Sequence, residues 1–351
     1  MLETPVVLFI FRRPELTRRV LEVLRLVQPR HLLVVSDGPR ASGPSEAELC
    51  QAARGVIEEV DWPCQVYRND AAVNLGCGRR VATGIAWTFE QFEEAIFLED
   101  DCLPDPSFFE MARQLLEVYR DDPRVMTLSG FNPLGSWRSE QQSYCFSRYG
   151  SHWCWATWKR AWLHYDYDMQ ELDKPGSLVR LQDEVADPEM LVSMRAVWDR
   201  IRQGNLDTWD SQWRLAQLLQ GSWSVVPAVN LVSNIGFGRQ ATHTRQTLGL
   251  SANQERQSLS FPLKAPPHVA VDQAYDRRYM NFWLGRPDAE LVLARVEQHL
   301  GAHRNAQALL LAEAALRNQR MGLTETDRNR LESCRERAVA AMRARNLSER
   351  S

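Results

Sequence analysis

Three consecutive carboxylates, Glu99, Asp100 and Asp101, directly follow the apolar run at residues 95–98. A short apolar run of this kind predicts a buried strand. In open α/β sheets, ligands bind at the carboxyl ends of the strands. Neighbouring carboxylates repel one another, and Mg²⁺ or Mn²⁺ relieves that repulsion while also binding diphosphate oxygens. The motif therefore predicts a holder for a metal-bound nucleotide diphosphate, and the alternative from these residues alone is a solvated acidic turn.

Polar residues also follow the two preceding strand-like runs. Asp37 lies just past the run at 31–36, where its carboxylate either accepts hydrogen bonds from a base or ribose or forms a turn or helix cap. Arg12 and Arg13 follow the first run, at 6–11, and face either a phosphate or solvent. These positions predict side chains at the same sheet edge as the acidic motif.

A helix start near residue 76 is the third candidate. Gly76 and Gly78 flank Cys77, and Arg79 and Arg80 follow. Backbone N–H groups and two cations at a helix start suit a bound anion. A short glycine pair is weak evidence alone, but its place in the order of elements supports this interpretation.

Asp210 stands between two tryptophans, Trp209 and Trp213. Indole faces stack on the apolar faces of sugar rings, and a partly apolar pocket raises the pKa of a carboxylate toward neutrality, as a general base requires. The structural alternative places both tryptophans in the core and makes Asp210 a helix cap. His243, in a Gly-rich polar loop, either folds over a diphosphate, contacts a metal, or is a surface residue.

Hydrophobic periodicity predicts alternating strands and helices in the first third of the chain. Strands are expected at 6–11, 31–36, 64–67, 95–98 and 125–129, and helices at 15–27, 45–60, 79–92 and 106–119. Alternation at this spacing implies right-handed crossovers and a mostly parallel sheet with flanking helices. The fold class is therefore α/β, of the nucleotide-binding, Rossmann-like type.

The pattern loosens beyond residue 130. The aromatic block at 153–162 predicts a helix in its second half, with Trp155, Trp158 and Trp162 on one face. Further helices are expected at 190–202 and 209–219, and a strand at 223–226. We predict a catalytic domain over 1–245, an irregular connecting segment over 246–287 and a helical extension over 288–351. The last helices pack on the domain, pair two subunits as a homodimer, or contact another partner.

Composition narrows the function. The formal net charge is −3, so no broad basic field favours nucleic acid. The seven cysteines form no CxxC pair, which indicates reduced thiols, and no Cys/His cluster has zinc-ligand spacing. The N-terminus lacks the basic and apolar regions of a signal peptide. A cytoplasmic protein is expected.

Four motifs in order resemble GT-A glycosyltransferases of the bacterial branch near glycosyltransferase family 2, and also the N-acetylglucosaminyltransferase I type. They are the segment 5–14, Ser36-Asp37-Gly38, Asn74-Leu75-Gly76, and the segment 97–101, whose Glu-Asp-Asp ending matches the DxD metal motif of that fold. The resemblance spans residues 1 to about 245. It implies a metal-dependent transferase that moves a sugar from a nucleotide-sugar donor to a glycan, lipid-linked or small-molecule acceptor. The resemblance favours UDP as the donor nucleotide. Bacterial relatives often build surface glycans, which implies visits to the inner membrane face.

The resemblance also implies residue roles. Asp101 would coordinate Mn²⁺ or Mg²⁺ together with His243, Asp100 would contact the ribose or sugar, and Asp37 the base or ribose. Asp210 would deprotonate the acceptor hydroxyl and so invert the anomeric carbon. Trp209 and Trp213, with Trp153 and Trp155 from the aromatic block, would line the sugar or acceptor pocket. The remaining donor-binding positions are Phe11, Arg12, Arg13, Asn74, Gly76, Arg79, Arg80 and Glu99.

Two other classes stay open on sequence. A sugar nucleotidyltransferase uses similar chemistry but normally carries a Gly-rich signature with Arg and Lys after the first strand, where this chain has the segment FRRPE. A non-catalytic carbohydrate- or nucleotide-binding protein on the same fold is disfavoured by the intact acidic motif and Asp210.

Overall fold

The computed structural model describes residues 1–40, 44–236 and 254–348. The chain divides into two compact units. The first comprises residues 1–238 and 253–276, and the second comprises residues 239–252 and 277–351.

An eight-stranded mixed sheet forms the centre of the first unit, in the order β3-β2-β1-β4-β8-β6-β9-β7. The first four of these strands pair in parallel, and β6 pairs with β9 in parallel, whereas β8 and β7 run against their neighbours. The predicted α/β fold with a mostly parallel sheet is confirmed. The strands are β1 (Val6–Ile10), β2 (His31–Ser36), β3 (Gln65–Asp70), β4 (Glu94–Glu99), β6 (Val125–Ser129), β7 (Tyr144–Ser147), β8 (Trp155–Trp158) and β9 (Trp223–Pro227).

Side chains of the central strands alternate between two cores, one on each face of the sheet. Leu8 of β1 and Leu98 of β4 belong to a core that also contains residues of α1 and α4, while Phe9 and Phe97 belong to one that contains residues of α3 and α8. A strand buried on both faces reads as a continuous apolar run, as β1 and β4 do. The helices are α1 (Pro14–Val27), α2 (Pro44–Gly55), α3 (Cys77–Phe89), α4 (Pro106–Val118), α5 (Lys159–Trp162), α6 (Ser177–Glu184), α7 (Pro188–Arg202) and α8 (Asp210–Gln220), with 3₁₀ turns at Val56–Glu59 and Gln170–Asp173.

The aromatic block is helical in its second half, as predicted, over Lys159–Trp162. Trp155 and Trp158 belong instead to strand β8 (Trp155–Trp158), between β4 and β6, so the predicted helix face shared with Trp162 is wrong. Periodicity cannot separate a short, fully buried strand from a helix segment, because both read as an apolar run. Three further strands were not predicted, namely β7 and the small antiparallel pair β5 (Cys102–Pro104) and β10 (Val232–Asn234).

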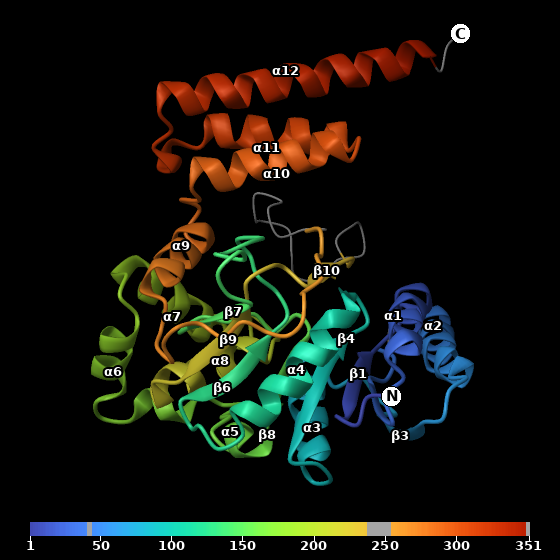
Figure 1. Cartoon of the computed structure of the whole chain (residues 1–351). Coiled ribbons are helices and arrows are strands. Elements are labelled where there is room, and N and C mark those ends of the chain that lie inside the picture. The colour runs from blue at the N-terminus through green and yellow to red at the C-terminus, as the bar shows by residue number, and fades with distance from the viewer. Residues whose placement is uncertain (41–43, 237–253, 349–351) are drawn as a thin grey trace. The chain divides into compact units, whose positions relative to one another are not determined.

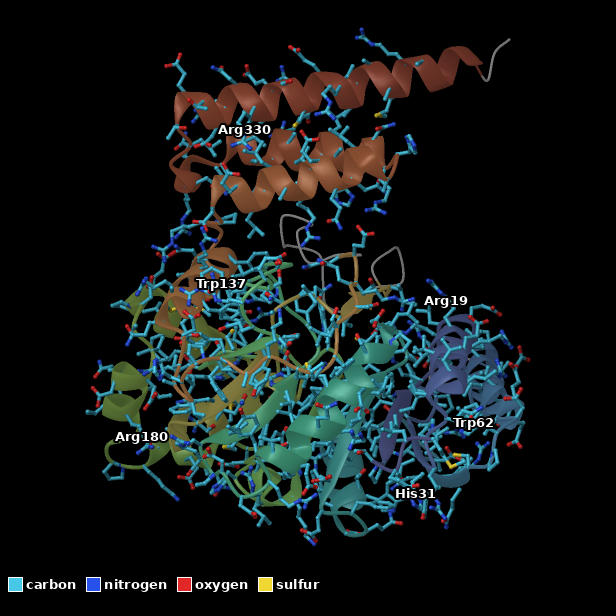
Figure 2. The ribbon with its side chains drawn as sticks, viewed as in Figure 1. Arg19, His31, Trp62, Trp137, Arg180 and Arg330 are labelled. Carbon is cyan, nitrogen blue, oxygen red and sulfur yellow. The ribbon has the colours of Figure 1, made fainter. Side chains whose placement is uncertain are left out.

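Helix α9 (Gln273–Trp283) lies within the segment expected to be irregular. It is followed by α10 (Ala289–Gly301), α11 (Asn305–Arg317), a 3₁₀ turn at Gln319–Met321 and α12 (Glu325–Ser348), so the expected terminal helices are present. These last three helices pack against one another, and Arg330 of α12 bonds to Glu290 of α10 at 2.5 Å (Figure 2). Within the described residues, no helix is both long and apolar enough to cross a membrane.

Candidate active site

Four parallel strands deliver the predicted residues to one edge of the sheet. Arg12 and Arg13 follow β1, Asp37 follows β2, and Asp100 and Asp101 follow β4. Because β3, β2, β1 and β4 are adjacent and parallel, their carboxyl ends meet at this edge. The loop that carries Asn74 and Gly76 follows β3. The positions named from sequence are therefore neighbours in space.

The acidic motif is held by β1 and by the start of α1. The backbone N–H of Phe11 donates to Oδ2 of Asp100 at 3.2 Å. Arg13 Nη1 donates to Oδ2 of Asp101 at 2.6 Å, and Arg13 Nε lies 3.3 Å from Oδ1 of Asp100. Burial works against the charge of Arg13, but the carboxylates of Asp100 and Asp101 outweigh it and raise the pKa of Arg13.

Full ionisation of the three carboxylates in this cluster is unfavourable. Burial, followed by the charges of Asp101 and Asp210, raises the pKa of Glu99 to about 8, although Arg13 opposes the shift. Burial likewise raises the pKa of Asp100 to about 7 against the effect of Arg13. The single guanidinium of Arg13 therefore does not keep Glu99 and Asp100 fully ionised near pH 7, and a further cation beside them would favour their charged forms.

The donor set fits a hard cation with few protein ligands. Carboxylate oxygens suit Mg²⁺ and Mn²⁺, which keep most of their shell for water and phosphate. Gly236 packs directly against the carboxylate of Asp101, since a Cβ there would lie 2.2 Å from Oδ2 of Asp101. The described residues contain no group of three or more His, Cys, Asp or Glu side chains arranged to hold a metal. His243, the other predicted ligand, lies outside the described residues.

The carboxylate of Asp37 accepts four hydrogen bonds from neighbouring groups of the protein. Its carboxylate accepts hydrogen bonds from the backbone N–H groups of Gly38, Leu75 and Gly76, at 2.8, 2.9 and 3.2 Å, and from Nδ2 of Asn74 at 2.9 Å. Asp37 is buried. The carboxylate of Asp37 therefore holds the 74–76 loop in place. The side-chain amide of Asn74 donates both to Asp37 and to the carbonyl of Gly38.

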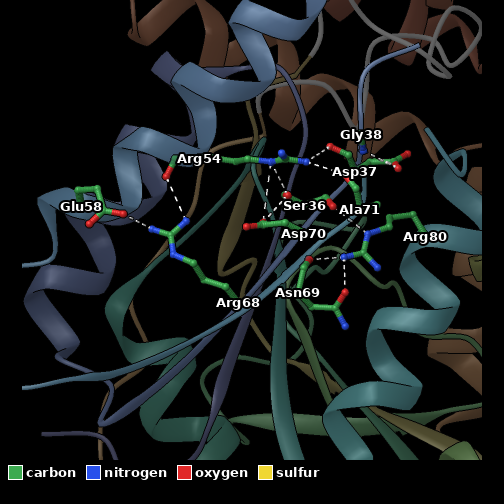
Figure 3. A network of polar contacts seen from close by, with 10 residues as sticks. All are labelled: Ser36, Asp37, Gly38, Arg54, Glu58, Arg68, Asn69, Asp70, Ala71 and Arg80. Carbon is green, nitrogen blue, oxygen red and sulfur yellow. Dashed lines mark hydrogen bonds and ion pairs between the residues drawn. The ribbon is translucent and has the colours of Figure 1, made fainter. Parts of the chain in front are cut away.

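Two arginines brace the edge beneath Asp37 (Figure 3). Arg54 donates to Oγ of Ser36 at 2.8 Å and to the carbonyls of Asp37 and Ala71 at 3.1 and 2.8 Å. Arg80 donates to the carbonyl of Ser36 at 3.0 Å and to Asn69. Arg80, predicted to face a donor phosphate, is buried and ties the ends of β2 and β3 together.

The N-terminus of α3 holds an anion supplied by the chain itself. The backbone N–H of Gly78 donates to Oδ1 of Asp207 at 2.9 Å. A Cβ on Gly76 or Gly78 would lie 2.4 or 2.6 Å from an oxygen of Asp207, so the two glycines make room for it. Gly76 also has φ +81°, a conformation that favours glycine. The exposed Arg79 lies over the ring of Tyr167, at 5.2 Å from its centroid.

Phe11 and Arg12 belong to a cluster with the first turn of α2. Arg12 Nη1 donates to the buried Glu46 at 2.7 Å, and the same carboxylate accepts from the backbone N–H of Arg40 at 2.8 Å. The guanidinium groups of Arg12 and Arg40 lie 5.7 and 5.3 Å from the ring centroid of Phe11. Arg12 and Arg13 therefore point to different carboxylates.

Asp210 is exposed and lies in the first turn of α8, where Thr208 donates to its carboxylate. The residue before it, Trp209, is the N-cap, so Asp210 is not the helix cap of the structural alternative. The apolar enclosure expected around Asp210 is absent here, because the flanking indoles of Trp209 and Trp213 turn into the core. The charge of Asp210 nonetheless contributes to the raised pKa of Glu99.

The four predicted pocket tryptophans are divided between the two faces of the sheet. Trp155, Trp209 and Trp213 are at most 3% exposed and pack together, with Trp155 and Trp209 stacked at 5.3 Å between centroids. Trp213 donates from Nε1 to Oγ1 of Thr127 at 3.0 Å. Trp153 packs instead against Phe131 in the other core. In this state the first three form core, and their faces are covered.

His152 was not singled out from sequence. It is buried between Trp155 and Trp209, with centroid distances of 5.5 and 5.4 Å, and its Nε2 has no hydrogen-bond partner. Burial, and then the charge of Arg214, lowers the pKa of His152 to about 3. His152 is therefore neutral near pH 7.

Asp207 and Glu46 were missed as well. Asp207 lies three residues before Asp210 in a polar segment, and from sequence such a segment is simply a connection between two helices. Glu46 begins a predicted helix, where an acidic residue is ordinary. No local signal shows that either carboxylate reaches another segment.

Comparisons with known proteins give limited information. No family model matches the chain, and no curated sequence matches it. Among solved structures, mouse xyloside xylosyltransferase 1 in its apo form is similar at 10% identity and a TM-score of 0.32, covering 62% of this chain and 81% of that one. A UDP-glucose pyrophosphorylase complexed with UDP-glucose is similar at 11% identity and a TM-score of 0.24, covering 41% and 62%. Likenesses this weak assign no activity to this chain.

Proposed function

We propose that this chain is a metal-dependent GT-A-type glycosyltransferase that moves a sugar from a nucleotide-sugar donor, a UDP-sugar, to an acceptor hydroxyl with inversion. One observation carries the proposal. Asp37, the 74–76 loop, Arg13 and the Glu99–Asp101 carboxylates follow four adjacent parallel strands in the order that the resemblance requires.

Each group then has a chemical task. Asp101 would hold Mn²⁺ or Mg²⁺, and the ion when bound would neutralise the charge that develops on the leaving diphosphate. Asp210 would accept the proton of the acceptor hydroxyl, since its carboxylate is exposed on the first turn of α8 and acts electrostatically on Glu99. Once Asp210 has taken its proton, the acceptor oxygen would bond to the anomeric carbon as the bond to the diphosphate breaks on the opposite face, and this direct displacement inverts the configuration.

Thermal stabilisation tests donor binding. Wild type and Asp101→Asn are melted with a panel of nucleoside diphosphates and nucleotide-sugars, with and without Mn²⁺. A ligand that binds the folded state alone raises the melting temperature. We expect a shift with uridine nucleotides that needs Mn²⁺ and is lost in Asp101→Asn but kept in Asp121→Asn, an exposed control. No shift with any nucleotide would refute the donor assignment.

Transfer is tested separately with Asp210→Asn. Loss of a general base lowers kcat by about 10²–10⁴-fold while donor binding persists. Product anomers are identified by NMR, and retention of configuration would reject the role of Asp210. Release of pyrophosphate from a nucleoside triphosphate would identify a nucleotidyltransferase instead.

A further inference from the structure

We propose that Arg13 is an exchangeable internal cation, which neutralises Asp100 and Asp101 until a divalent metal ion replaces it and then binds the diphosphate of the donor. This inference rests on the proposed function. It assigns Arg13 two successive partners, where the resemblance implied donor contact alone.

Arg13 occupies one oxygen of the carboxylate that would hold a metal. Arg13 Nη1 lies 2.6 Å from Oδ2 of Asp101, and Arg13 Nε lies 3.3 Å from Oδ1 of Asp100. The other oxygen of Asp101 is approached by Sγ of Cys102 at 3.4 Å. A divalent ion on either oxygen of Asp101 would lie close to the guanidinium, and the two cations would repel each other. Metal binding at Asp101 therefore favours release of the guanidinium of Arg13.

The backbone of Arg13 is fixed while its side chain is accessible. Arg13 is the N-cap residue of α1, Pro14 follows it, and its carbonyl accepts from the N–H of Thr17 at 2.9 Å. The side chain of Arg13 is 24% exposed, against 4% for Asp100 and 14% for Asp101. The guanidinium thus lies toward solvent from the carboxylates, on the side from which a diphosphate would approach. Its planar fork suits bidentate phosphate binding.

Charge balance explains why the exchange is favourable. Arg13 brings a single positive charge to the two carboxylates that it contacts, Asp100 and Asp101, whereas a divalent ion brings two. The neighbouring Arg12 is held by Glu46 at 2.7 Å and is directed elsewhere. Arg13 is therefore the residue of this pair that metal binding would release.

The proposal is tested by measuring how substitutions of Arg13 change the affinities for Mn²⁺ and for UDP, which should change in opposite directions. Metal-free full-length wild type, Arg13→Gln and Arg18→Gln are titrated with Mn²⁺ alone, and free Mn²⁺ is followed by electron paramagnetic resonance. UDP affinity is then measured by calorimetry at saturating Mn²⁺. Arg18→Gln is the matched control, because Arg18 lies on the same helix and pairs with the exposed Glu59. Arg13→Lys keeps the charge without the fork.

Arg13→Gln is expected to bind Mn²⁺ about tenfold more tightly and UDP about tenfold more weakly. Arg18→Gln should change neither affinity, and Arg13→Lys should fall between wild type and Arg13→Gln in both. A general loss of structure would weaken both affinities, so the opposite signs exclude it.

Unchanged or weaker Mn²⁺ binding by Arg13→Gln would overturn the exchange. Tighter binding of both Mn²⁺ and UDP would overturn the transfer of Arg13 to the diphosphate. If wild type binds no UDP while Arg13→Gln still gains Mn²⁺ affinity, the proposed function fails and the neutralising role of Arg13 stands alone.

Discussion

The backbone N–H of Gly78 donates a hydrogen bond of 2.9 Å to Oδ1 of Asp207, across 129 residues of the chain. This bond places a carboxylate at the N-terminus of α3, where the sequence suggested a bound anion. Asp207 lies three residues before Asp210. The same bond therefore fixes the turn that leads to the proposed base.

Replacing Asp207 by Ala should lower the free energy of unfolding by about 1 kcal/mol, since the N-terminus of α3 loses a carboxylate that accepts from a backbone N–H, much as when an N-cap side chain is removed. The value is read from urea denaturation. Asp121→Ala, at an exposed position, should cost less than about 0.5 kcal/mol. Gly78→Ala should reproduce the loss, since its Cβ would meet Asp207 and Thr208 at 2.6 Å. Equal stability of Asp207→Ala and wild type would show that the bond contributes little.

Arg54 and Arg68 allow a matched comparison of two arginines near the sheet edge that carries Asp37 (Figure 3). Arg54 reaches three acceptors at once, whereas Arg68 Nη2 bonds to the exposed Glu58. A lysine cannot reproduce the planar fork. Arg54→Lys should cost about 1–3 kcal/mol, because buried acceptors lose their donors.

Arg68→Lys should cost at most about 1 kcal/mol, as exposed ion pairs do. Both free energies come from urea denaturation under identical buffer conditions. A smaller loss for Arg54→Lys than for Arg68→Lys would contradict the bracing role of Arg54.

The sequence predicts the sheet edge well because its signals are local. Apolar runs such as β1 and β4 end at charged residues, and the alternation with helices dictates parallel pairing. Nothing beyond neighbouring residues is needed to place Asp37 and Asp101 at one edge. The domain boundaries and the residue roles stay predictions.

The remaining features depend on distant partners. Residues Trp155–Trp158 form a strand because β4 and β6 pair with them, and no local pattern records those neighbours. From sequence, Asp37 could accept hydrogen bonds from a ribose or from the protein itself. In the structure it accepts them from the backbone of the 74–76 loop. The sequence allows Trp213 a place in a pocket or in the core, and its hydrogen bond to Thr127 belongs to the core arrangement.

His152 should make the protein sensitive to acid. Its pKa is about 3 in the folded state, against an ordinary value near 6.5, because burial and then the charge of Arg214 disfavour protonation, while Asp210 opposes the shift. The unfolded chain therefore binds the extra proton between these values, and stability falls as the pH drops from about 6.5 toward 3.

The size of this effect is limited to about 1.4 kcal/mol per pH unit. Urea denaturation of wild type and His152→Gln at pH 7, 6, 5 and 4 gives both slopes. His152→Gln should lose stability less steeply than wild type over this range. Parallel slopes would mean that His152 does not carry the acid sensitivity.

Trp213 separates a core role from a sugar-binding role. Its side chain is fully buried, it packs at 5.1 Å from the ring of Trp162, and its Nε1 donates to Thr127. Trp213→Phe removes one of two donors to Oγ1 of Thr127, leaving Gln217, and puts a smaller ring in the core, which should cost about 1–3 kcal/mol. Trp283→Phe, at a position 38% exposed, should cost much less.

The same Trp213→Phe variant should keep the KM for donor and acceptor within about twofold of wild type, since a covered indole face cannot stack on a sugar. Denaturation and steady-state kinetics on one preparation decide between the roles. A raised acceptor KM with unchanged stability would show that the tryptophan cluster opens to form the pocket that the sequence predicts. A stability loss with unchanged KM would place Trp213 in the core, and the sugar would then contact residues nearer Asp210 at the exposed edge.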